Sequence, residues 1–215
     1  LDCGTHNTAG VTQAAKIMKR HFEELGWKAE LVDLGEEVGK GLFATNKPDA
    51  EHYDLLMNAH LDTVFPDGTA AARPFKRDGN IVTGPGCQDC KAGVLSILYT
   101  LKNAAPADLD RLAIAVCLDP DEETGSKYSS EWMRSVAVRS STGLVFEAAR
   151  PNGALVRSRK GAGQLRVTLQ GVAAHAGNNP KGGRSAILEA ARMICDISAL
   201  SDFDGTGVTV NAGTI

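Results

Sequence analysis

The sequence LAIAVCLDPDEETGS (residues 112–126) joins an apolar run to a cluster of carboxylates, and the interpretation of the whole chain starts from it. Its first seven residues are all apolar. A short continuous apolar run is expected of a strand that is covered on both faces, as strands of parallel sheets are. The carboxylates then follow at the point where this strand would end.

The flanking sequence alternates between strand patterns and helix patterns. Apolar residues at helical spacing predict helices over residues 11–25, 91–101 and 126–136, and short apolar runs predict strands over residues 29–34, 41–45, 54–59 and 143–146. Asp78-Gly79 indicates a hairpin turn within residues 76–82. This alternation predicts an α/β fold with a mainly parallel sheet flanked by helices.

The pattern changes near residue 153. Strands are predicted over residues 154–159, 164–170 and 207–211, with a long helix over residues 186–200. This order is typical of a small α+β domain with an open antiparallel sheet. We therefore expect two domains, residues 1–152 and residues 153–215.

Composition excludes some classes of function. The chain has 23 Lys and Arg against 26 Asp and Glu, a net charge of −3, whereas nucleic-acid binders usually carry a basic excess. No apolar run is long enough to span a bilayer. Five cysteines without regular spacing do not form a disulfide framework, so we expect a reducing, cytoplasmic location. The chain begins at Leu1 and not at Met, which leaves a secreted or periplasmic location open.

Chemically active side chains recur at the ends of predicted strands or in the loops that follow them. They are His60, Asp62, Asp89, Glu122, Glu123 and Glu147. Sites in open α/β sheets form beyond the carboxyl ends of the strands. Mixed histidine and carboxylate ligands suit zinc well. Together these positions predict a metal site in one crevice.

Each of these features also has an ordinary explanation when it is taken alone. His60 and Asp62 can lie at a solvated strand end, Asp89 can cap the next helix, and an acidic loop is usually only a helix cap. Cys87 and Cys90 form a CxxC pair, which is either a thiol site or small apolar filling of a packed loop.

Several segments, in this order, resemble the co-catalytic zinc peptidases and amidohydrolases, the family of glutamate carboxypeptidase, aminoacylase, acetylornithine deacetylase and succinyl-diaminopimelate desuccinylase. The catalytic segments are HLDTVFPDGT (60–69), GPGCQDCKAG (84–93), DPDEETGS (119–126) and LVFE (144–147). Two more, RKG (159–161) and GVAAHAG (171–177), resemble the lid or dimerisation domain inserted in that family. The resemblance covers nearly the whole chain.

The resemblance implies a role for each residue and two zinc ions per active site of the full-length protein. His60 and Glu147 bind one zinc, Asp89 bridges both and Glu123 binds the second. Asp62 supports His60, and Glu122 is the general base. His175 belongs to the lid domain and reaches the active site of a partner subunit, so the resemblance also implies a homodimer formed through the lid domain.

The function implied is zinc-dependent hydrolysis of an amide or peptide bond in a small N-acyl amino acid or dipeptide-like substrate. Glu147 favours a carboxypeptidase or deacylase over the aminopeptidases and dipeptidases of the family, which tend to have Asp there. The sequence also leaves open an inactive binding or dimerisation protein and a thiol-redox protein. The family's last zinc ligand, a histidine, and its carboxylate-binding residues are expected beyond Ile215.

Overall fold

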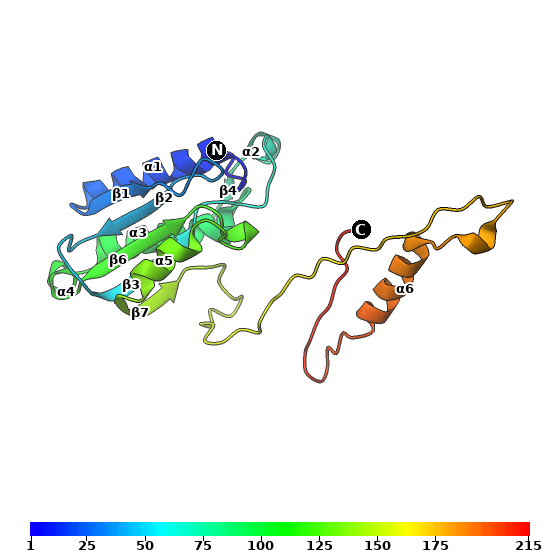
Figure 1. Ribbon diagram of the computed structural model, residues 1–215. Helices are drawn as coiled ribbons and strands as arrows, with labels where there is room; N and C mark the ends of the chain where they lie inside the picture. The colour runs from blue at the N-terminus through cyan, green and yellow to red at the C-terminus, as the bar shows by residue number, and fades with distance from the viewer. The chain divides into compact units, whose positions relative to one another are not determined.

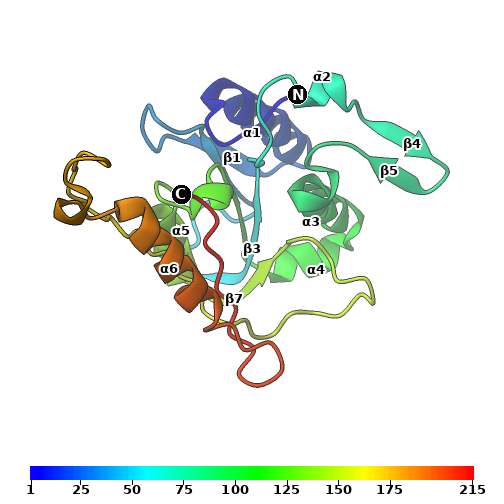
Figure 2. The ribbon, with the colours of Figure 1, turned by 90° about the vertical axis from the view of Figure 1, so that its right-hand side faces the viewer.

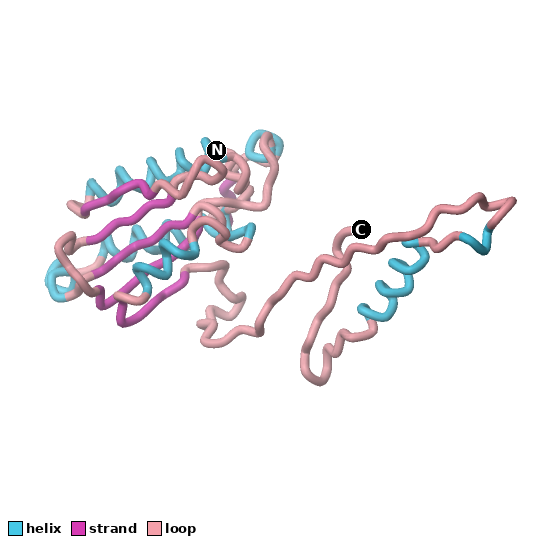
Figure 3. Tube along the Cα trace, in the orientation of Figure 1, coloured by secondary structure: helices cyan, strands magenta, loops and turns pink.

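A computed structural model describes residues 1–215, and the chain divides into two compact units, Leu1–Val156 and Arg157–Ile215. All the strands belong to the first unit, as the magenta segments of Figure 3 show. The boundary expected from the sequence, between residues 152 and 153, stays a prediction about domains.

The first unit is built on a five-stranded sheet (Figure 1). Its strands, in spatial order, are β1 (Lys28–Val32), β2 (Gly41–Thr45), β6 (Ile114–Asp119), β3 (Tyr53–His60) and β7 (Ser140–Val145). β3 is parallel to both of its neighbours, whereas β2 is antiparallel to β1 and to β6. The predicted α/β fold with helices around a mainly parallel sheet is confirmed.

Helices cover both faces of this sheet, and β6 is buried along its whole length. Ile114, Val116 and Leu118 belong to the larger core cluster, to which α1 (Thr8–Glu24) and α3 (Ala92–Asn103) contribute. The alternate residues Ala115 and Cys117 belong to a second cluster with Val136 of α5 (Ser130–Ala137). Such alternation is the period-two geometry of a strand, and it explains why the sequence of β6 has no polar face.

The helix α1 shows how local sequence sets the limits of an element. The Asn7 side chain caps its first turn by accepting a hydrogen bond from the Gly10 N–H, and Gly26 follows its end with a φ of +79°. Asn is a favoured N-cap, and glycine takes a positive φ without strain. No helix in the structure is both long enough and apolar enough to cross a membrane.

Shorter elements connect the main ones. The predicted hairpin is present as β4 (Lys76–Asp78) and β5 (Ile81–Thr83), with Gly79 at a φ of +57° in its turn, and Figure 2 shows it beyond the edge of the sheet. The remaining short elements of the first unit are α2 (Thr69–Ala72), the irregular turn η1 (Cys87–Lys91), α4 (Pro106–Arg111) and η2 (Glu122–Thr124).

The second unit differs from the expectation. It contains the predicted helix, α6 (Ala186–Ser198), and a short turn, η3 (Pro180–Gly182), with two isolated bridges, Val172 to Arg184 and Asp202 to Val208. The predicted strands over residues 154–159, 164–170 and 207–211, and the antiparallel sheet they imply, are wrong for this structure. Leu155 and Leu165 are 96% and 89% exposed. These segments have neither a partner strand for their backbone groups nor a layer to cover their apolar side chains, and both are needed for a stable sheet.

Candidate metal centre and active site

The candidate site lies at the carboxyl ends of three parallel strands. β3 ends at His60, β6 ends at Asp119 directly before the Glu122-Glu123 turn, and β7 ends just before Glu147. His60 and Asp119 are partners in the register of β3 and β6. The sheet therefore brings segments more than 80 residues apart in sequence to one edge, which is where open α/β sheets place their sites.

His60 is the centre of the site. It is 1% exposed, and its two ring nitrogens face carboxylates on opposite sides. Nδ1 lies 3.2 Å from Asp62 Oδ1, and Nε2 lies 2.9 Å from Asp89 Oδ1. Nε2 is also 3.8 Å from Glu147 Oε2. The contact expected between His60 and Asp62 is thus present, and it fixes the orientation of the ring.

Asp62 connects the histidine to the acidic turn. Its side chain is fully buried and accepts hydrogen bonds from Thr5 Oγ1 at 2.7 Å and from the backbone N–H groups of Glu122 and Glu123 at 3.2 Å each. Burial alone would raise the pKa of Asp62, but the hydrogen bonds from His60 and Thr5 outweigh it and lower the pKa. The ionised carboxylate therefore anchors both His60 and the η2 turn.

Thr5 is a functional neighbour that sequence reasoning missed, and it gives a stability prediction. Thr5→Val removes the hydroxyl that satisfies the buried Asp62 carboxylate. We expect it to lower the free energy of unfolding by about 1–3 kcal/mol, the cost of losing one hydrogen bond to a buried charged group. Urea denaturation followed by circular dichroism measures this change.

The matched control is Thr5→Ser, which keeps the hydroxyl and loses one methyl group, worth about 0.8 kcal/mol. It should retain most of the stability that Thr5→Val loses. Equal stabilities of the Ser and Val variants would show that the methyl group, and not the hydrogen bond to Asp62, accounts for the effect.

Glu147 reaches the site because β7 and α3 approach closely. The backbone at Phe146, directly after β7, donates its N–H to the Asn58 carbonyl at 2.7 Å. A Cβ at Gly93, in the first turn of α3, would overlap the Phe146 carbonyl. Glycine at this position therefore lets the segment that carries Glu147 pass beside the turn that carries Asp89.

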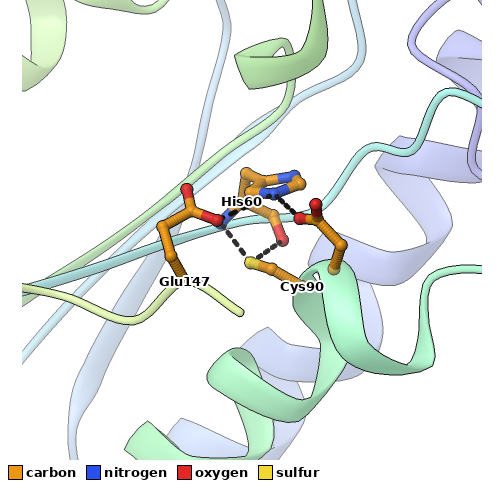
Figure 4. A group of neighbouring side chains, drawn as sticks. His60, Cys90 and Glu147 are labelled. Atoms are coloured by element: carbon orange, nitrogen blue, oxygen red, sulfur yellow. Dashed lines mark hydrogen bonds and ion pairs between the residues drawn. The ribbon is translucent and has the colours of Figure 1, made fainter. Parts of the chain in front are cut away.

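Four possible metal ligands converge at this point: His60, Asp89, Cys90 and Glu147. One donor atom from each lies within 4.8 Å of the others, and Figure 4 shows the side chains of His60, Cys90 and Glu147 around a common centre. This donor set fits a divalent metal, because imidazole, carboxylate and thiolate are all ligands of zinc. Glu122 and Glu123 are not members of the group.

The electrostatics of His60 agree with such a fit. Burial lowers the pKa of its imidazole, but hydrogen bonds to Asp62, Cys90 and Asp89 outweigh burial and raise the pKa to about 12. Nδ1 faces the Asp62 carboxylate, and Nε2 faces the carboxylates of Asp89 and Glu147. A divalent cation on Nε2 would meet the Asp89 and Glu147 carboxylates with a larger positive charge than a proton has.

Glu122 and Glu123 lie in η2, held toward the site through their backbone contacts with Asp62. Burial and the neighbouring Glu147 and Asp89 carboxylates raise the pKa of Glu122, and burial likewise raises that of Glu123. The side chain of Glu122 is exposed, so it is accessible to a substrate. A carboxylate with a raised pKa is suited to accept a proton near neutral pH.

His175 lies in the second unit, on the exposed segment between Val172 and Arg184, two residues that form an isolated bridge. Its Nδ1 accepts hydrogen bonds from the backbone N–H groups of Gly177 and Asn178, at 3.0 Å each. An accepting Nδ1 places the proton of the neutral ring on Nε2. His175 therefore presents an N–H donor to solvent.

Comparison with known proteins identifies related sequences. Residues 56–200 match the family described as peptidase family M20/M25/M40. Carboxypeptidase G2 of Pseudomonas sp. (strain RS-16) is 29% identical over 205 residues, which cover 94% of this chain and 49% of that protein. An uncharacterised protein of Bacillus subtilis, YqjE, is 26% identical, with 90% and 52% covered. The chain spans about half the length of these curated relatives.

Solved structures show the same fold. The aminopeptidase PepT from Bacillus cereus aligns with a TM-score of 0.59 at 20% identity, covering 92% of this chain and 53% of that one. The M20 family metallo-carboxypeptidase Sso-CP2 from Sulfolobus solfataricus aligns with a TM-score of 0.53 at 20% identity, covering 71% and 36%.

Proposed function

The chain belongs to the peptidase family M20/M25/M40, and from this membership we propose that it forms part of a zinc-dependent hydrolase. The reaction is cleavage of an amide or peptide bond in a small N-acyl amino acid or dipeptide-like substrate. One observation carries the proposal. The donor atoms of His60, Asp89 and Glu147 meet at the carboxyl edge of the sheet.

In this proposal His60 and Glu147 would hold one zinc, Asp89 would contribute to this ion and to a second one, and Glu123 would contribute to the second. His60, Asp89 and Glu147 belong to the group of converging donors, whereas the role of Glu123 rests on the family resemblance. Zinc, when bound, lowers the pKa of a water molecule and polarises a carbonyl group. Asp62 supports the metal-binding histidine from the other side of its ring, at 3.2 Å, as a carboxylate behind a ligand histidine does in zinc sites.

Glu122 is the proposed general base. It accepts a proton from the attacking water and then delivers it to the leaving amine. Its backbone N–H donates to Asp62. Its pKa is raised toward neutral pH, which suits a general base. Asp62 therefore positions the base and a metal ligand through one buried carboxylate.

His175 is the proposed donor to the oxygen of the tetrahedral intermediate. Its Nε2 carries the proton, and Nδ1 is engaged by two backbone N–H groups, so the ring keeps one donor for a developing negative charge. In this proposal the second unit is a lid and dimerisation domain, and His175 serves the active site of a partner subunit. The homodimer, the small-molecule substrate, the lack of a nucleic-acid partner and the cytoplasmic location are part of the same proposal.

The substrate class gives an experimental test on the full-length protein. We expect substrates with a free carboxylate on the amine side to be hydrolysed with a kcat/KM about 10-fold to 100-fold above that of the matching carboxamides. A hydrogen bond to a charged group contributes about 1.5–3 kcal/mol, and about 1.4 kcal/mol corresponds to tenfold. The similarity to a protein named carboxypeptidase G2 supports this class.

The measurement compares initial rates on an N-acyl amino acid, its C-terminal amide and a tripeptide amide, which has a free N-terminus but no free carboxylate. Preference for the tripeptide amide would assign the protein to the aminopeptidase and dipeptidase branch instead. No hydrolysis of any of them by the zinc-loaded protein would favour an inactive binding protein.

A further inference from the structure

Cys90 lies where an apolar residue would suffice for packing, but its sulfur faces the metal ligands. The residue is fully buried and carries a free thiol. Its Sγ accepts a hydrogen bond from the His60 N–H at 3.2 Å and donates to the His60 carbonyl at 3.4 Å. Figure 4 shows the sulfur beside the backbone of His60.

The thiol also lies among the donor atoms themselves. Sγ is within 4.8 Å of one donor atom on each of His60, Asp89 and Glu147. In a tetrahedral site with metal–ligand bonds of about 2.0–2.3 Å, the donor atoms lie about 3.3–3.8 Å apart. The donor atoms thus need to approach one another by at most about 1.0–1.5 Å to surround one ion.

We propose that the Cys90 sulfur is a direct ligand of the metal ion held by His60, Asp89 and Glu147. The S–H bond breaks, its proton leaves to solvent, and a sulfur–metal bond forms with the thiolate electron pair. The hydrogen bond from Sγ to the His60 carbonyl is lost, while the His60 N–H continues to donate to the sulfur. No electron is transferred, so the metal keeps its oxidation state.

The consequence is a change in the preferred metal. A thiolate is a soft ligand that favours zinc, cobalt and cadmium over magnesium and manganese, which prefer oxygen donors. A site with histidine, two carboxylates and a thiolate is therefore selective for thiophilic ions. This inference rests on the proposed function, because it assumes that the site binds a metal.

Cobalt titration of the metal-free protein tests the assignment. We expect cobalt(II) to produce visible d–d bands together with a near-ultraviolet sulfur-to-cobalt charge-transfer band. Cys90→Ser should keep the d–d bands and lose the charge-transfer band. Cys87→Ser, which removes the half-exposed thiol of the same loop, is the matched control and should keep both.

Three outcomes would overturn the proposal. Cobalt d–d bands without a charge-transfer band in the unaltered protein exclude sulfur ligation and leave the proposed hydrolase intact. A charge-transfer band that disappears in Cys87→Ser and persists in Cys90→Ser would make Cys87, and not Cys90, the sulfur ligand. Absence of any cobalt binding contradicts both the sulfur ligand and the metal site of the proposed function.

A second measurement needs no variant, so it holds even if Cys90→Ser fails to fold. X-ray absorption of the unaltered protein loaded with one equivalent of zinc should show one sulfur at about 2.3 Å from zinc, the usual zinc–thiolate distance. A zinc shell made only of nitrogen and oxygen at about 2.0–2.2 Å would contradict the proposal.

Discussion

Glu122→Gln is expected to lower the kcat of the full-length protein by about 10²-fold to 10⁴-fold, the usual contribution of a general acid–base group. The amide cannot accept the proton of the attacking water. Glu122 lies outside the group of metal-ligand donors, so zinc content should stay at the level of the unaltered protein. Steady-state kinetics and elemental analysis of the same preparation give both quantities.

Glu131→Gln is the control for this substitution. Glu131 lies in the first turn of α5 and is exposed, so the same change of charge there should leave kcat within about twofold, as for surface substitutions away from special features. A Glu122→Gln protein with normal kcat would remove Glu122 from the mechanism. One that has lost its zinc would instead make Glu122 a ligand.

His60→Asn is expected to weaken zinc binding by at least about 100-fold. Loss of a residue that only supports a metal ligand already costs up to about 100-fold in affinity, and loss of the ligand itself should cost at least as much. The asparagine removes Nε2, the ring atom that faces Asp89 and Glu147. Its amide nitrogen is expected to replace the hydrogen bond that His60 Nδ1 makes to the buried Asp62 carboxylate. Competition with a chromophoric chelator measures the dissociation constant.

His52→Asn provides the matched control. His52 is exposed, and its Nε2 lies 2.8 Å from Ser141 Oγ, outside the group of metal ligands. Its replacement should leave zinc affinity unchanged. Equal affinities of the His60 and His52 variants would place the zinc elsewhere in the protein.

The sheet of the first unit was predictable because its central strand β6 is buried on both faces. β6 is apolar from Ile114 to Leu118, and its order among helical segments implies parallel pairing. The antiparallel pairing of β2 with β6 could not be predicted from the sequence. Residues 41–45 are mostly apolar, and an apolar strand fits a parallel or an antiparallel pairing equally well.

The strands predicted after residue 153 failed for a related reason. Alternating apolar residues indicate a strand only if another strand and a covering layer are available. Val167 is half exposed and Leu165 almost fully exposed, so the pattern alone could not decide the structure. The helix α6 satisfies its own backbone groups, and it was predicted correctly from residue 186 onward.

Within the site, sequence order indicated which strand ends would meet, and the structure brings His60, Asp89 and Glu147 together. The contribution of Thr5 to the site, its hydrogen bond to Asp62, could not be found this way, because Thr5 does not follow a predicted strand. Cys90 is a different case. Its position in a CxxC pair suggested a partner thiol, whereas its neighbours in space are the candidate metal ligands His60, Asp89 and Glu147.

The central claim is that His60, Asp89 and Glu147 hold a zinc ion. It is tested most directly by an anomalous difference map, recorded at the zinc absorption edge from crystals of the protein grown with zinc. The account predicts a peak at about 2.0–2.2 Å from His60 Nε2 and from a carboxylate oxygen of Asp89 and of Glu147. No peak at this position, with His60 still hydrogen-bonded directly to Asp89, would contradict it.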